Sequence, residues 1–133
     1  MTTGLQELAT VRRNSTLTVD ATVELLDGSA ADLTGLTGDD IRWGLSARRG
    51  GPRLVTVDLD GADTGTGLVT IVSAAAGTIR IQFRAPLPPA DPDPFRAKNA
   101  PYWQELEVTL AETVTTQFWG PVRIEKSIFS EAA

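Results

Sequence analysis

The side chains of this sequence that could do chemistry are mainly carboxylates, because the chain contains no histidine and no cysteine. Their absence excludes cysteine nucleophiles, histidine-based triads, disulfides and thiolate zinc sites. Glu105 and Glu107 share one face if they lie on a strand, and paired carboxylates can hydrolyse glycosides. Alternating glutamates are also common on the solvent-facing side of an edge strand. We interpret this pair as such a face and expect no catalytic residues and no enzyme.

A second group of carboxylates occurs in the segment Asp58–Asp63, which reads DLDGAD. Alternate carboxylates on a tight turn can wrap around a calcium ion. The segment lacks the downstream bidentate glutamate and the full ligand set of such a loop, and Asp and Gly are also the usual residues of a hairpin tip. We therefore expect a solvated turn, with no metal and no cofactor.

The three tryptophans fall into two groups. Trp43 is in phase with the apolar residues around it, so we predict that it is a core residue. Trp103 and Trp119 are out of phase with the apolar residues that follow them, which places them near each other on an outer face if their strands are neighbours. Exposed aromatics of this kind are typical of protein interfaces and of sugar-stacking platforms. The alternative is that both rings are partly buried beneath a proline-rich loop.

The elements that must position these residues are strands, because apolar residues recur at every second position along most of the chain. Between Ser15 and Leu26 the alternation is almost perfect, with Leu17, Val19 and Leu25 among the residues on the apolar face. Residues 60–67 and 86–101 read as loops, and the second of these holds six of the chain's eight prolines. The predicted strands cover residues 15–26, 40–48, 53–59, 68–72, 78–84, 102–110 and 116–127.

These strands and the turn signals between them predict an all-β fold, an Ig-like antiparallel β-sandwich of about seven strands with a long proline-rich loop. Gly120–Pro121 within the last strand suggests a bulge or an edge position. We divide the chain into an N-terminal arm (residues 1–13), the sandwich domain (14–127) and a C-terminal tail (128–133). Only Gly4–Val11 could form a helical turn or two.

The length of 133 residues is enough for one domain with its own core, and the formal charge is −5. An acidic surface repels phosphate backbones, so we expect no nucleic-acid partner. No apolar run approaches the length of a membrane span, and the first residues do not have the pattern of a signal peptide. We expect a contact surface on the two ends of the chain, the proline-rich loop and the outward tryptophans, namely Leu5, Leu8, Val11, Phe95, Trp103, Trp119 and Phe129.

Five motifs occur in a recognisable order from Arg13 to Ile124. They are a Thr-rich first strand, DLTG at residues 32–35, DIRWGL at 40–45, YWQELEV at 102–108 and GPVRI at 120–124. This order resembles the Ig-like domains of phage and prophage structural proteins. The nearest likeness is to the N-terminal domain of siphophage baseplate upper proteins and to tail or head-fibre attachment domains. The proline-rich insert at 86–101 departs from that pattern, and no fibre region follows in this sequence.

The resemblance implies a non-enzymatic virion component of the tail, baseplate or head surface. Such a protein would be made in the host cytoplasm, bind neighbouring virion subunits and be oligomeric within the particle. The alternative function is a carbohydrate-binding β-sandwich module that uses Tyr102, Trp103 and Trp119. An enzyme that acts through carboxylates alone is the third possibility.

Overall fold

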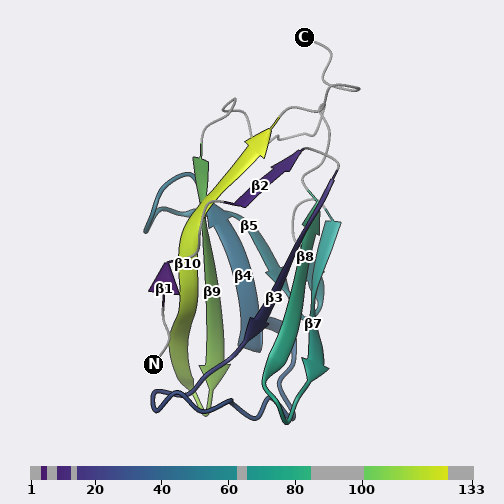
Figure 1. Ribbon diagram of the computed structural model, residues 1–133, viewed down its shortest axis with the longest axis vertical. Helices are drawn as coiled ribbons and strands as arrows, with labels where there is room; N and C mark the ends of the chain where they lie inside the picture. The colour runs from purple at the N-terminus through teal and green to yellow at the C-terminus, as the bar shows by residue number, and fades with distance from the viewer. Residues whose placement is uncertain (1–3, 6–8, 13–14, 63–65, 85–100, 126–133) are drawn as a thin grey trace.

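The computed structural model describes residues 4–5, 9–12, 15–62, 66–84 and 101–125, and they form a sandwich of two β-sheets (Figure 1). The all-β prediction is confirmed. The larger sheet has the strand order β1-β10-β9-β4-β5-β6, with β2 also paired to β10, and the smaller has the order β3-β8-β7. The strands are β1 (Gly4–Leu5), β2 (Ala9–Arg12), β3 (Thr16–Thr22), β4 (Ile41–Ser46), β5 (Arg53–Asp58), β6 (Gly61–Ala62), β7 (Thr66–Ser73), β8 (Thr78–Arg84), β9 (Pro101–Leu110) and β10 (Thr113–Glu125).

The core lies between the two sheets and is centred on Trp43, as predicted. The Trp43 ring is fully buried against Phe83, with ring centroids 5.7 Å apart. Its indole N–H donates a hydrogen bond of 3.0 Å to Oε1 of Gln104, which β9 also directs inward. The side-chain oxygen of the buried Gln104 therefore has its hydrogen-bond partner in Trp43, the largest core residue.

The first predicted strand is shorter than the alternation suggested. β3 ends at Thr22, and the chain then turns so that the N–H of Val23 donates to the carbonyl of Gly77, at 2.7 Å. Val23 is buried, but Leu25 and Leu26 are 42% and 76% exposed. The prediction that Leu25 continues the apolar face was wrong, because the turn at Asp27–Gly28 begins before that face can be extended.

The N-terminal segment is also placed differently from the prediction. β1 and β2 pair in parallel with β10, with Gly4 opposite Phe118 and Val11 opposite Ile124. Residues 4–5 and 9–12 are thus strands of the larger sheet and not a helical turn or an arm outside the sandwich. The outer side of β10 carries backbone donors and acceptors that need partners, and these two segments supply them.

Two smaller expectations changed as well. Residues 60–67 contain more than a loop, because β6 pairs with the end of β5 and β7 already begins at Thr66. Of the two alternatives for Gly120–Pro121, a bulge or an edge position, the bulge is not found there, because the register of β10 shifts between Thr116 and Phe118. Pro121 pairs with Trp103 of β9 and falls between the β10 residues that pair with β1 and β2, where its missing N–H costs little. The proline-rich stretch 86–100 lies outside the described residues.

Candidate functional site

The outward face of the larger sheet carries the densest group of functional side chains in the described chain. Alternation along β9 points Trp103, Glu105 and Glu107 away from the core while Tyr102, Gln104 and Leu106 point into it. β4, β5 and β10 contribute further side chains to the same face, so aromatic and charged groups meet there. The aromatic group and the charged group are adjacent, because Trp119 of β10 is opposite Glu105.

Trp103 and Trp119 lie side by side on this face, as their phase in the sequence predicted. Their ring centroids are 5.6 Å apart and the ring planes are inclined by 20°. Trp119 lies opposite Glu105 and Trp103 lies opposite Pro121, so the two indoles are diagonal neighbours across antiparallel strands. Both are half-buried.

Arg49 completes the aromatic group. It lies in the turn between β4 and β5, and its guanidinium carbon is 4.1 Å from the Trp119 ring centroid and 5.9 Å from that of Trp103. Both distances are compatible with a cation–π contact. A guanidinium on the far side of Trp119 from Trp103 would be much more distant from Trp103, so Arg49 lies close to both rings. We call Arg49, Trp103 and Trp119 the tryptophan–arginine cluster.

Two donors near this cluster are buried without an acceptor. The indole Nε1 of Trp103 and the Nε of Arg123 are both inaccessible and form no hydrogen bond within the described part of the chain. A buried donor left in this way typically costs about 1–3 kcal/mol. Arg123 is two residues beyond Pro121 on β10, so both donors belong to the outward face.

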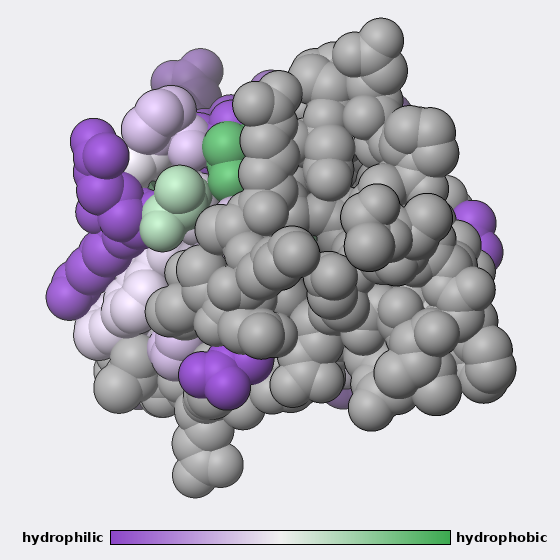
Figure 2. All heavy atoms as spheres, turned by 90° about the horizontal axis from the view of Figure 1, so that it is seen from above, coloured by the Kyte–Doolittle hydropathy of each residue, from purple (hydrophilic) through white to green (hydrophobic). Residues whose placement is uncertain are grey.

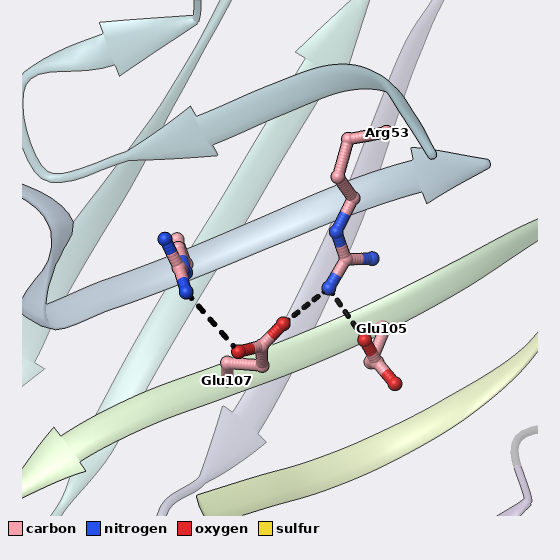
Figure 3. A network of polar contacts seen from close by, with 4 residues as sticks. Arg53, Glu105 and Glu107 are labelled. Carbon is pink, nitrogen blue, oxygen red and sulfur yellow. Dashed lines mark hydrogen bonds and ion pairs between the residues drawn. The ribbon is translucent and has the colours of Figure 1, made fainter. Parts of the chain in front are cut away.

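The charged group on this face is held by Arg53 (Figure 3). Nη2 of Arg53 donates to carboxylate oxygens of both Glu105 and Glu107, and Nη2 of Arg42 donates to the second oxygen of Glu107 at 3.3 Å. Gly44 makes this arrangement possible. A Cβ at Gly44 would lie 2.8 Å from Cδ of Arg53, so only glycine lets the Arg53 side chain cross β4 to reach β9.

The electrostatics of Glu107 are opposite to those of a general acid. Partial burial acts to raise the pKa of Glu107, but the hydrogen bond from Arg53 and the charges of Arg42 and Arg53 outweigh it and hold the pKa below its ordinary value. A carboxyl that protonates a glycosidic oxygen needs a raised pKa. The geometry of the pair therefore favours a structural ion-pair network over catalysis.

The described part of the segment Asp58–Asp63, which was considered as a calcium loop, forms a turn. Oδ1 of Asp58 accepts hydrogen bonds from the backbone N–H groups of Asp60 and Gly61, at 2.7 and 3.1 Å. Asp63 lies outside the described residues. Within the residues that the structure describes, no cluster of three or more His, Cys, Asp or Glu side chains could hold a metal ion.

Of the other predicted contact residues, the structure brings the backbone of Leu5 next to this group, because Leu5 is the partner of Trp119 in the β1–β10 pairing. Leu5 and Val11 lie in β1 and β2, whose backbones pair with β10. Leu8, Phe95 and Phe129 lie outside the described residues. Seen from above, the described surface is mainly hydrophilic and shows only small hydrophobic areas (Figure 2). No helix within the described ranges is long and apolar enough to cross a membrane.

Sequence reasoning missed Arg49, Arg53 and Gly44 as members of this surface. The sequence signal for Arg49 was the pair Arg48-Arg49 in a turn, which by itself indicates only positive charge. No protein-family model matches the chain, and no curated protein is detectably similar to it.

Proposed function

We propose that this protein is a non-enzymatic structural component of a bacteriophage or phage-like particle, at the tail, baseplate or head surface. It binds neighbouring subunits through the outward face of its larger sheet, with the tryptophan–arginine cluster at the centre of the contact. The particle context rests on the order of the five sequence motifs, and the binding role rests on the cluster.

The single observation that carries the binding role is the contact of Arg49 with both Trp119 and Trp103. Tryptophan and arginine are enriched among the residues that dominate the energy of protein interfaces. Here two indoles are fixed on paired strands, so little side-chain entropy is left to lose on binding.

The ion-pair network next to the cluster supports a binding role over a catalytic one. Arg53 engages both Glu105 and Glu107, which fixes their carboxylates and neutralises part of their charge. A polar and charged rim around an aromatic centre is the usual anatomy of a protein interface.

Carbohydrate binding is the second candidate, since two nearly parallel indoles on a sheet are also a platform for sugar rings. A sugar would have to stack on an open indole face, and Arg49 lies over the Trp119 ring at 4.1 Å. The position of Arg49 therefore favours a protein partner.

Site-specific photo-crosslinking tests the proposal. A benzophenone amino acid replaces Arg49 in cells that produce the particle, and the matched control carries it at Val72, a 58% exposed position on β7 of the smaller sheet. We expect Arg49 to crosslink to another structural protein of the particle and Val72 not to do so. Absence of the polypeptide from purified particles overturns the virion role. Binding to a glycan array that is lost in Trp119→Ala would instead favour the carbohydrate-binding module.

A further inference from the structure

Among the strands that the structure describes, β3 is an edge strand of the smaller sheet. It is seven residues long and pairs with β8 through an unbroken antiparallel register, from Thr16 opposite Arg84 to Thr22 opposite Thr78. No described strand pairs with its other side, so β3 forms the edge of the smaller sheet (Figure 1). An edge of this kind presents backbone N–H and C=O groups that can template another strand.

The other edges of the sandwich carry the features that block such pairing. β10 is covered by β1 and β2, of two and four residues, and β6 is only two residues long. β5 and β7 are each interrupted by a register shift. Short strands and bulges are the usual protection of sheet edges. β3 has no proline, no lysine or arginine and no bulge.

The apolar side of β3 is also incompletely covered. Leu17, Val19 and Ala21 point toward the core but remain half-buried. A groove of about 330 Å³ runs beside this strand, and its lining combines Val19, Ala21 and Phe118 with the polar residues Asp20, Thr22, Glu24 and Gln117. A strand added at the edge would extend the sheet and place its own inward side chains over this groove.

The sequence of β3 is complementary to itself in an antiparallel pairing. With Val19 on a two-fold axis, Thr18 of one copy faces Asp20 of the other, and Leu17 faces Ala21. No two like charges are opposed, because Asp20 is the only charged residue of the strand, and it already bonds to Nε of Arg80 at 2.8 Å. Threonine pairs are favourable across antiparallel strands.

We propose that β3 pairs antiparallel with β3 of a second copy of this chain, about a two-fold axis at Val19. The pairing joins the two smaller sheets into one continuous sheet and gives an isologous dimer. The proposal goes beyond the binding role of the tryptophan–arginine cluster, which lies on the other sheet, and it stands independently of that role.

Cysteine crosslinking tests the axis directly, because the chain has no native cysteine. Antiparallel partners directly opposite each other have Cα atoms about 4.5–5.5 Å apart, a separation that a disulfide can span. We expect Val19→Cys to form a covalent dimer rapidly under mild oxidation. The matched control is Thr70→Cys, an exposed position on β7. Crosslinking of Thr70→Cys at the same rate would show random collision and overturn the proposal.

Sedimentation velocity gives the second test. We expect the native chain to pass from monomer to dimer as its concentration rises toward about 1 mM, the range of a weak complex. Val19→Lys places an inward charge on the edge and should leave a folded monomer, whereas Val72→Lys, at a 58% exposed site on β7, should dimerise normally. A native chain that stays monomeric throughout overturns the proposal, as does a Val19→Lys variant that still dimerises.

Discussion

The side chain of Gln117 pairs with the backbone of Glu24 as a neighbouring strand would. Oε1 of Gln117 accepts from the Glu24 N–H at 3.0 Å, and Nε2 of Gln117 donates to the Glu24 carbonyl at 3.2 Å. Gln117 occupies the bulge of β10, where the register with β9 shifts between Thr116 and Phe118. The bulge turns a polar side chain inward, and a single amide joins the chain after β3 to the larger sheet.

Replacing Gln117 with alanine should destabilise the fold by about 1–3 kcal/mol, because it leaves the backbone donor and acceptor of Glu24 without their described partner. Urea unfolding followed by tryptophan fluorescence measures the change. Gln82→Ala is the matched control, since Gln82 is exposed on β8, and its effect should be within about 0.5 kcal/mol of zero. Equal effects at both sites would contradict the bridging role.

Gly44→Ala should destabilise the protein by about 1–3 kcal/mol and displace Arg53 from the two glutamates. The new Cβ would lie 2.8 Å from Cδ of Arg53 and 3.0 Å from the Val55 carbonyl oxygen. Carboxyl NMR titration should show the pKa of Glu107 rising toward its ordinary value. In an Arg53→Ala background the same substitution should cost less, because only the contact with Val55 remains. An unchanged cost in that background would show that Arg53 does not depend on Gly44.

Stability should fall in acid partly through Glu107. Burial acts to raise the pKa of this carboxyl, but Arg53 and Arg42 lower it below the ordinary value of 4.5. As the pH falls, Glu107 therefore takes up its proton at a higher pH in the unfolded chain than in the folded one. The contribution of ionised Glu107 to folding stability is present above pH 4.5 and is lost as the pH falls through the folded pKa. Urea midpoints measured against pH should decline less steeply for Glu107→Gln than for the native chain.

Two other carboxyls in the described part of the chain contribute to the acid dependence in that experiment. Hydrogen bonds from Ser29 lower the pKa of Asp27, and hydrogen bonds from Thr34 lower that of Asp32. Glu107→Gln should therefore keep a shallow decline in acid. Glu112→Gln, at an exposed position in the β9–β10 turn, is the control and should follow the native curve. A Glu107→Gln curve that matches the native one would refute the contribution of the ion-pair network.

Trp43→Phe should cost about 3 kcal/mol or more, because it removes core volume and leaves Oε1 of Gln104 without its hydrogen bond. Gln104 is only 2% exposed, so water does not readily replace the indole donor. The double variant Trp43→Phe/Gln104→Leu should recover part of the loss in urea unfolding, since it removes the unsatisfied amide. No recovery would mean that lost volume alone explains the cost.

Alternation predicted the long strands well, because one face of each is buried. β8 begins and ends where the pattern does, and in β9 the phase separates Gln104 from Trp103 correctly. The same phase placed Trp103 and Trp119 side by side on an outer face. For a strand that lies between long neighbouring strands, a two-residue periodicity is therefore enough to predict which face of the sheet each side chain is on.

The features that were missed depend on contacts between distant segments. β1 has two residues and no pattern of its own, and its place follows only from the open side of β10. Arg49 reaches Trp119 because the β4–β5 turn folds over the face of the sheet, which the sequence of the turn does not reveal. Arg53 reaches β9 only across Gly44, so its role needs the register of three strands.

The parallel pairing of β1 and β2 with β10 has a consequence for folding while the protein is synthesised on the ribosome. β1 and β2 have their partners in β10, with Gly4 opposite Phe118, so these two early segments must wait until the distant β10 has been synthesised. Contacts between the two ends of a chain are the slowest to form, because the intervening loop must close first. Completion of the larger sheet is therefore a late step of folding. Until it occurs, the nascent chain carries two unsatisfied segments that a chaperone or a second chain can capture.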